Sequence, residues 1–214
     1  MFGGDHSQGI GSINGLKSVH PKTKLLWIDA HVDINNQQST LTGDIHGGPV
    51  AYLSGLAPYE KKPVLSLKDI VYWGLRQWEP EERQLLDDRS IPWYKSELCA
   101  PEAISQMKKD IESYFFPKGR QADEPYWISF DIDGVTWEEF RSTGTPESRG
   151  IPIKFMLQFF ETFIPESVGL DFTEVNFRLS EGEQTQKDKE TVKLLMQKII
   201  EVAQRSKPQY SALK

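Results

Sequence analysis

Acidic and imidazole side chains gather in two short clusters and near the start of the chain. They are His6, Asp29, His31, Asp33, Asp131 and Asp133. Alternate side chains of an extended segment point the same way, so each cluster can present its members on one side. Mostly oxygen ligands with two imidazoles and no thiolate suit Mn²⁺ better than structural zinc. Two such ions would share a water molecule, lower its pKa and hold it as a hydroxide nucleophile.

The alternative interpretation of each cluster is a loop cap, because an Asp-x-Asp sequence commonly follows a strand without binding an ion. Here, however, strongly apolar runs precede both clusters, Leu25–Ile28 the first and Tyr126–Phe130 the second. Carboxylates beside buried segments would be costly without a cation. The sequence therefore favours the convergence of both clusters on metal.

The composition predicts one globular domain over residues 1–214, with 38% hydrophobic residues, 26% charged residues and a formal net charge of −6. The acidic balance disfavours nucleic acid and anionic membranes as partners and favours a small cationic substrate. The single cysteine, Cys99, excludes an internal disulfide framework and is expected to be a buried apolar residue. Since the sequence contains no long apolar stretch and no secretory leader, we expect a cytoplasmic protein.

Apolar runs alternate with helical patterns along the chain. The predicted strands are Leu25–Ile28, Ile70–Leu75, Ile91–Tyr94, Tyr126–Phe130 and Val168–Phe172. The predicted helices are Ser7–Val19, Pro80–Asp88, Ala100–Phe116, Pro152–Phe163 and Lys187–Ser206. This order indicates an α/β fold of three layers with a doubly wound, mostly parallel sheet, in which ligands bind beyond the carboxyl ends of the strands.

Six short motifs occur in the order seen in ureohydrolases, and over essentially its whole length the chain resembles the arginase family most closely. The motifs are Gly3–Ser7, Trp27–Asn35, Gly43–Gly47, Ser129–Gly134, Thr143–Pro146 and Gly169–Asn176. Several motifs in the right order are far more specific than any one of them.

The resemblance implies a site with two Mn²⁺ ions per chain that hydrolyses L-arginine to L-ornithine and urea. One ion would be held by His6, Asp29, Asp33 and Asp131, and the other by Asp29, His31, Asp131 and Asp133. A hydroxide shared by the ions would attack the guanidinium carbon.

The resemblance also implies catalytic roles for Asp33, His46 and Glu174. His46 corresponds to a proton shuttle, which suits an imidazole with a pKa near neutrality, although a turn histidine is the alternative. Glu174 corresponds to the acid that pairs with the substrate guanidinium. Thr145 lies in the loop expected beside the same group.

The amino-acid end of the substrate distinguishes arginine from agmatine. By resemblance, Asn35, Thr40 and Thr42 supply neutral donors for the α-carboxylate, and Glu79 and Glu82 lie near the α-amino group. Glu79 stands where the family usually has aspartate, and Asp44 replaces an asparagine. A ureohydrolase for another guanidino compound, such as agmatine, is therefore an alternative. For Glu79 and Glu82 the alternative is simply an acidic first turn of a helix.

Two departures from the family pattern give a further alternative, a catalytically inactive, truncated arginase-like partner protein. The segment Val135–Phe140 replaces the usual Asp-Pro turn, and Met1 and Phe2 directly precede the first motif, where family members have earlier strands. We therefore expect the domain to be incomplete at its N-terminus. The tail Gln204–Tyr210 is similar to the segment through which arginases contact neighbouring subunits, which indicates a homo-oligomer, a trimer by resemblance.

Overall fold

The computed structural model describes residues 1–36, 38–40, 42–58, 62–96 and 101–206. Its centre is a five-stranded sheet in the order β3-β2-β1-β4-β5, and all neighbouring strands are parallel. The strands are β1 Lys24–Ile28, β2 Ile70–Trp73, β3 Trp93–Tyr94, β4 Tyr126–Asp131 and β5 Ser167–Thr173. Each lies within one or two residues of a predicted strand, and the predicted parallel α/β fold is confirmed.

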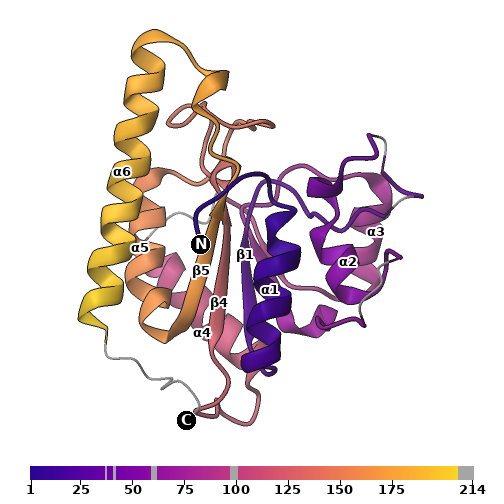
Figure 1. The fold of residues 1–214 in the computed structure, drawn as a ribbon. Coiled ribbons are helices and arrows are strands. Elements are labelled where there is room, and N and C mark those ends of the chain that lie inside the picture. Colours follow the sequence, from indigo (N-terminus) through magenta and orange to yellow (C-terminus); the bar gives the residue numbers. More distant parts are fainter. Residues whose placement is uncertain (37, 41, 59–61, 97–100, 207–214) are drawn as a thin grey trace.

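Helices cover both faces of this sheet (Figure 1). They are α1 Gln8–Val19, α2 Pro49–Ser54, α3 Pro80–Asp88, α4 Pro101–Phe115, α5 Ile153–Phe163 and α6 Gly182–Arg205. Side chains of α1, α2 and α3 pack in one hydrophobic cluster, and side chains of α4, α5 and α6 pack in another. The three-layer arrangement follows from these two clusters.

The alternation of side chains along β1 explains why two cores form. Leu25 and Trp27 belong to the cluster beneath α1 and α2, whereas Leu26 and Ile28 belong to the cluster beneath α4 and α5. Successive side chains of a strand point to opposite faces, so a run that is apolar at every position must be covered on both sides. The continuous apolar runs of the sequence are thus explained.

The helices differ from the sequence prediction at two places. Helix α6 begins at Gly182 instead of Lys187, because its first turn is polar and exposed and gives no apolar stripe to detect. Helix α2 was not predicted, since six residues are too few for a helical period to be recognised. Proline at its first turn and the left-handed Gly55 at its end, with φ 79°, mark its limits. Ala100, at the predicted start of α4, Cys99 and residues 207–210 of the tail lie outside the described residues.

The direction of winding changes between β1 and β4. From the central β1 the chain proceeds to β2 and β3 on one side and then to β4 and β5 on the other. In a parallel sheet such a switch leaves a crevice beyond the carboxyl ends of the two strands, where ligands bind. Both acidic clusters follow these strand ends, so the topology brings them together.

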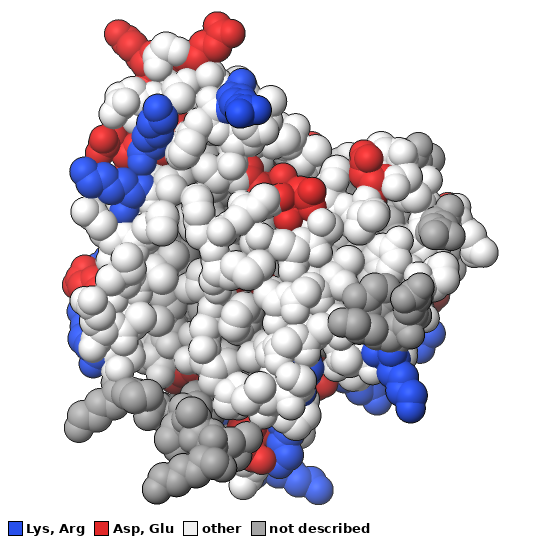
Figure 2. Space-filling view, viewed as in Figure 1, with Lys and Arg blue, Asp and Glu red and all other residues white. Residues whose placement is uncertain are grey.

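At the β5 edge of the sheet, the first residues of the chain extend the pairing by one bridge. Phe2 forms a parallel bridge with Phe172, and the rest of this edge borders an apolar hollow of about 930 Å³ that Leu170, Met196 and Ile199 help to line. Few charged side chains lie over the middle of this face (Figure 2). Among the described helices, none combines the length and hydropathy needed to cross a membrane.

Arg76 joins the loops that follow β2 and β4. Its guanidinium donates to backbone carbonyls of three segments, including Gly74 at 2.9 Å, Asp133 at 2.5 Å and Glu147 at 2.9 Å. The fork of five N–H donors of an arginine can reach several carbonyls at once, which an ammonium on a flexible stem cannot do. Arg76 therefore fixes the backbone of Asp133 relative to its neighbours.

We expect Arg76→Lys to lower the free energy of unfolding by about 2–4 kcal/mol, because several buried carbonyls lose their donors. Denaturant titration of the wild-type and variant chains measures this loss. Arg178→Lys is the control, since Arg178 is exposed. If Arg76→Lys lowers the free energy of unfolding by no more than the ~0.5 kcal/mol typical of an exposed substitution, Arg76 does not fix this backbone as described.

Candidate metal centre and active site

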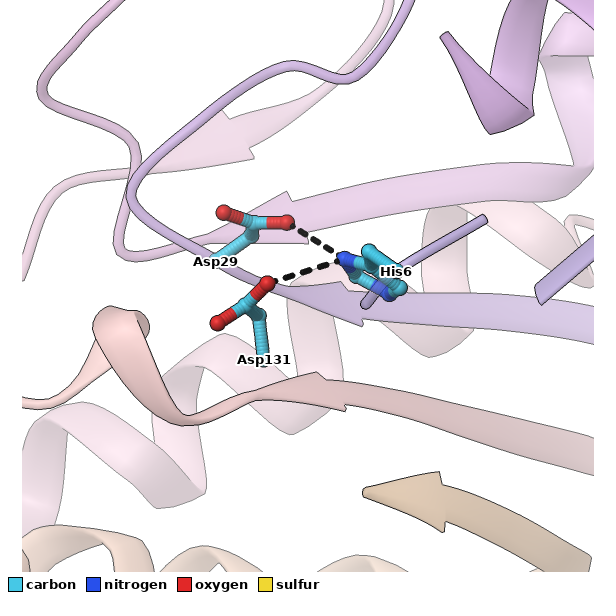
Figure 3. A group of neighbouring side chains, drawn as sticks. All are labelled: His6, Asp29 and Asp131. Carbon is cyan, nitrogen blue, oxygen red and sulfur yellow. Dashed lines mark ion pairs between the residues drawn. The ribbon is translucent and has the colours of Figure 1, made fainter. Parts of the chain in front are cut away.

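His6 faces three carboxylates at the switch point between β1 and β4. Its Nδ1 lies 3.0 Å from Asp29 Oδ2, 3.0 Å from Asp33 Oδ2 and 3.2 Å from Asp131 Oδ2. Figure 3 shows Asp29 and Asp131 reaching from neighbouring strand ends toward the same ring nitrogen. All four side chains are buried. His6, Asp29 and Asp131 together have the geometry to hold one metal ion.

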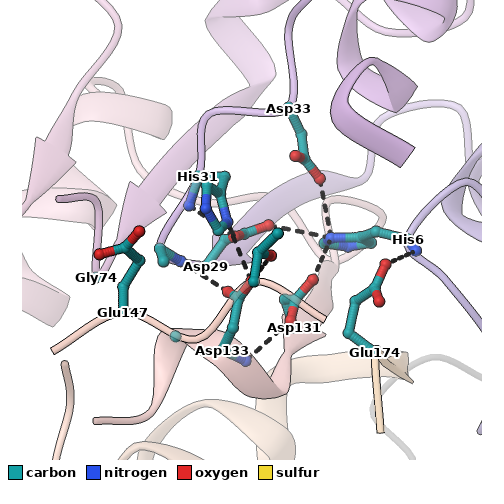
Figure 4. Close-up of polar contacts among 12 residues, drawn as sticks. His6, Asp29, His31, Asp33, Gly74, Asp131, Asp133, Glu147 and Glu174 are labelled. Carbon is teal, nitrogen blue, oxygen red and sulfur yellow. Dashed lines mark hydrogen bonds and ion pairs between the residues drawn. The ribbon is translucent and has the colours of Figure 1, made fainter. Parts of the chain in front are cut away.

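His31 forms a second group of the same kind, beside the first (Figure 4). Its Nδ1 lies 3.0 Å from Asp133 Oδ2 and 3.4 Å from Asp29 Oδ1. Asp29, His31 and Asp133 can hold a metal ion, so Asp29 is common to both groups. The Oγ1 of Thr145 donates to Asp133 Oδ2 at 3.0 Å and borders this second group.

Backbone N–H groups orient three of the carboxylates in the same manner. Asp29 Oδ1 accepts from the N–H of His31 at 2.7 Å, Asp131 Oδ1 from that of Asp133 at 2.9 Å, and Asp133 Oδ1 from that of Ala30 at 3.1 Å. One oxygen of each carboxylate is thereby fixed, and the other is turned toward an imidazole. Local backbone geometry thus sets the direction in which each acid faces.

Two other acids reach the centre through strained backbone. Asp33 has φ 55° and Glu174 has φ 65°, in the left-handed region that residues other than glycine seldom adopt. Asp33 is held there by the N–H of Val50 in α2, which donates to its carbonyl at 2.9 Å. Glu174 is held by its own N–H, which donates to the carbonyl of Gly4 at 3.0 Å, while its Oε1 accepts from the N–H of His6 at 2.7 Å.

The buried charges of the centre leave a negative excess. Burial, together with the nearby Asp29 carboxylate, raises the pKa of Asp33 to about 8. Burial and the neighbouring Asp133 and Asp29 also raise the pKa of Asp131 well above its ordinary value. Burial lowers the pKa of His6, but its contacts with Asp131, Asp29 and Asp33 outweigh that effect and raise it. A divalent cation beside these carboxylates would lower their pKa values and favour their charged forms.

Two buried atoms of the centre lack a hydrogen-bond partner among the described residues, His6 Nδ1 and Asp33 Oδ2. They lie only 3.0 Å apart, and both residues line the cavity. Buried polar atoms are rarely left unpaired, and those that are call for a missing ion or water. The donors present therefore fit a divalent cation.

One cavity of about 160 Å³ collects the predicted residues. It is lined by His6, His31, Asp33, Asn35, Thr40, Thr42, His46, Glu79, Glu82, Asp131, Asp133, Thr145 and Glu174. Of the predicted site residues only Asp29 is absent from the lining, because it is fully buried beneath the two imidazoles. Residues up to 168 positions apart in the sequence are thus brought to one small space.

Two acids of the cavity wall, Glu79 and Glu82, have different surroundings. Glu82 accepts from the N–H of Ile34 at 3.2 Å and from that of Glu79 at 2.9 Å, so both of its oxygens are occupied by backbone. Burial raises the pKa of Glu82 to about 7. Glu79 instead has a buried Oε2 with no hydrogen-bond partner among the described residues. The Glu79 side chain also accepts from the backbone N–H of Glu82 in the capping box of α3, so one carboxylate oxygen of Glu79 remains available to a ligand.

The polar residues of the remaining wall belong to the loops after β1. Asn35 Oδ1 accepts from Ser39 Oγ at 2.9 Å, and the hydroxyls of Thr40 and Thr42 accept from the N–H groups of Gly43 and Asp44. His46 lies in a short 3₁₀ turn, Ile45–Gly47, and is half-buried at the cavity wall.

The segment Val135–Phe140, where the sequence departs from the family pattern, is packed against the sheet. Val135 bridges Ile151, and Phe140 is buried in the main core. Glu139 Oε2 accepts from the N–H of Ile153 at the start of α5 at 2.6 Å. The altered segment therefore still leads the chain to Thr145 beside Asp133.

Sequence reasoning gave no role to several side chains that contact the ligands. Trp27 stacks on His6, with ring centroids 4.3 Å apart, and its Nε1 donates to Asp29 Oδ2 at 3.0 Å. Ser129 Oγ lies 2.9 Å from His6 Nε2 and donates to Asp171. The available signal was a serine and an aspartate inside otherwise apolar strands, where a polar side chain requires a partner.

Known proteins resemble this chain in both sequence and fold. Arginase-1 of Bos taurus is 35% identical over 189 residues, which cover 82% of this chain and 57% of the bovine protein. The chain thus spans less than two thirds of that relative's length. The arginase of Entamoeba histolytica in complex with L-ornithine gives a TM-score of 0.76 at 28% identity, covering 91% of this chain and 68% of that one.

The fold is shared more widely than the sequence. An agmatine ureohydrolase of Thermoplasma volcanium gives a TM-score of 0.71 at 22% identity and covers 95% of this chain and 61% of that one. The sequence pattern of the arginase family, however, matches residues 1–201. With the identity to the bovine protein, this match shows that the chain belongs to the arginase family.

Proposed function

We propose that this chain carries the site of a dinuclear manganese hydrolase that cleaves L-arginine to L-ornithine and urea. The observation that carries the proposal is a pair of three-residue ligand groups that share the buried Asp29 and whose other members His6, His31, Asp131 and Asp133 line a cavity. The bovine and amoebal relatives are named arginases, and the latter was solved with L-ornithine. Both facts support arginine as the substrate.

The residues that would hold the cations are those of the two groups, with Asp33 beside the first. His6, Asp29, Asp33 and Asp131 would bind one Mn²⁺, and Asp29, His31, Asp131 and Asp133 the other. When bound, the two cations would act as Lewis acids that make water nucleophilic near neutral pH.

The cavity walls would orient a guanidino substrate by charge. Glu174 would receive the guanidinium, since a carboxylate accepts two parallel N–H bonds from its planar fork. Thr145 contacts Asp133 in the second group, and Glu79, which also lines the cavity, has a carboxylate oxygen that can accept from the α-ammonium. Asn35, Thr40 and Thr42 would bind the α-carboxylate, and His46 would carry a proton to the departing amine.

Three finer expectations belong to this proposal. Manganese is preferred over other divalent ions by the mixed carboxylate and imidazole donors. A homo-oligomer is supported by the resemblance of the tail, and a cytoplasmic location by the single cysteine. Agmatine is the competing substrate, because Glu79 and Asp44 depart from the family pattern at the amino-acid end.

Urea release from L-arginine tests the reaction directly. We expect the purified chain, preincubated with Mn²⁺, to release urea from L-arginine and to release much less from agmatine. His31→Ala should abolish the activity, because it removes one of the two imidazole ligands, whereas His20→Ala at the end of α1 should not. Release from agmatine alone would identify the competing substrate, and no release from either would favour the inactive partner protein.

The number of bound cations tests the shared ligand. After dialysis against Mn²⁺ we expect two ions per wild-type chain by elemental analysis, one for His31→Ala and fewer than one for Asp29→Asn, since Asp29 belongs to both groups. Asp188→Asn, at a buried carboxylate of α6, should retain two. A full complement in Asp29→Asn would contradict the bridging arrangement.

Glu79→Gln tests how the amino-acid end is bound. We expect KM for L-arginine to rise about 10- to 100-fold with a smaller change in kcat, because a charge-assisted hydrogen bond to the α-ammonium is lost. Glu81→Gln, an exposed acid in the first turn of the same helix, is the matched control. Equal KM values for the two variants would assign the acids of this segment to helix stability alone.

A further inference from the structure

Asp171 of β5 is a buried carboxylate that lies behind the metal centre and outside the proposed ligand set. Its side chain is completely inaccessible to solvent. Its Oδ1 accepts from Ser129 Oγ at 2.7 Å, and its Oδ2 accepts from Ser12 Oγ at 2.5 Å and from Trp127 Nε1 at 3.1 Å. Asp171 thus connects β5 with β4 and with α1, the helix that directly follows His6.

The hydrogen bonds around Ser129 have only one consistent direction. A carboxylate only accepts, so the single hydroxyl proton of Ser129 must be donated to Asp171. Ser129 Oγ also lies 2.9 Å from His6 Nε2, and having no second proton it must accept there. His6 Nε2 therefore carries a hydrogen.

The opposite nitrogen of the ring is the one that faces the carboxylates. His6 Nδ1 lies within 3.2 Å of Asp29, Asp33 and Asp131 and has no hydrogen-bond partner among the described residues. In a neutral imidazole that donates through Nε2, Nδ1 offers a lone pair. Asp171 thus fixes the direction in which the Ser129 hydroxyl donates. This direction places the ring proton of His6 on Nε2 and leaves the lone pair on Nδ1, which faces the carboxylates.

We propose that Asp171, acting through Ser129, is a positioning residue that holds His6 as the Nε2–H tautomer, with Nδ1 free to bind a divalent cation. This inference rests on the proposed function, because it concerns the cation of the His6 group. Groups that orient a ligating histidine through its second nitrogen commonly change metal affinity by about 10- to 100-fold.

The surroundings of Asp171 make Asp171→Asn a directional test. Trp127 Nε1 can only donate, so the amide oxygen of an asparagine must face it, and the amide NH₂ must then face Ser129. Ser129 would accept from the amide and turn its own proton toward His6 Nε2. The ring would be driven to the Nδ1–H form, in which the nitrogen facing the carboxylates is blocked.

Cation affinity gives the first readout. Calorimetric titration with Mn²⁺ should show that Asp171→Asn weakens one of the two sites about 10- to 100-fold and leaves the other within about twofold. Ser129→Ala, which removes the connecting hydroxyl, should weaken the same site. This second variant keeps the proposal testable if Asp171→Asn does not fold. Ser12→Ala removes another hydroxyl from Asp171 but leaves the connection to His6 intact, and should bind as the wild type does.

Nitrogen NMR of the histidine rings gives a second readout that is independent of turnover. With diamagnetic Zn²⁺ in place of Mn²⁺, the wild-type chain should show His6 with a proton on Nε2, and Asp171→Asn should lose that signal. The chain has only 4 histidines, so His20→Ala, His31→Ala and His46→Ala suffice to assign His6 by elimination. Asp188→Asn is the matched control, because Asp188 is equally buried and accepts from Ser142 at 2.6 Å, away from the ligand groups.

The outcomes separate the two proposals. A wild-type chain that binds no cation overturns the proposed function and, with it, the role of Asp171. A wild-type chain that binds two cations, together with Asp171→Asn and Ser129→Ala chains that bind both equally well, overturns the role of Asp171 alone. Retention of the Nε2 proton in Asp171→Asn also overturns it.

Discussion

Repulsion among four buried carboxylates at the ends of β1 and β4 is the constraint on which the rest of the site depends. Asp29, Asp33, Asp131 and Asp133 are all at most 5% exposed, and two imidazoles cannot neutralise them even when both are charged. A fold can tolerate such a group if other contacts fix the acids and either protonation or a bound cation relieves the repulsion. The parallel sheet holds the acids in place, because the carboxyl ends of β1 and β4 lie side by side at its switch point.

The fixing is achieved by neutral hydrogen-bond donors. Backbone N–H groups hold one oxygen of Asp29, Asp131 and Asp133, and Trp27 donates to the other oxygen of Asp29. Neutral donors orient a carboxylate without cancelling its charge, so the negative excess remains available to cations. Arg76, the nearby permanent cation, donates to backbone carbonyls, that of Asp133 included, and among the described residues none of its hydrogen bonds reaches a ligand carboxylate.

The parts of this arrangement that the sequence could predict are those with local causes. The apolar runs predicted the strands, and the alternation of Asp29, His31 and Asp33 predicted that their side chains point the same way. Both patterns can be recognised in a sequence because each spans only a few residues. The left-handed conformation of Asp33 could not be predicted, since it depends on α2, a helix too short for its period to be recognised. The donors to Asp171 could not be predicted either, because Ser129 and Ser12 lie 42 and 159 positions from it in the sequence.

Glu79 and Glu82 show how a structural and a functional interpretation of one segment can both hold. Glu82 accepts from two backbone N–H groups, which is the structural role expected of an acid in the first helical turn. Burial raises its pKa to about 7, so near neutrality it carries less negative charge than an exposed glutamate. Glu79 begins the same helix but keeps a buried oxygen unpaired at the cavity. Of the two acids, Glu79 is therefore the one that keeps a carboxylate oxygen available to a ligand in the cavity.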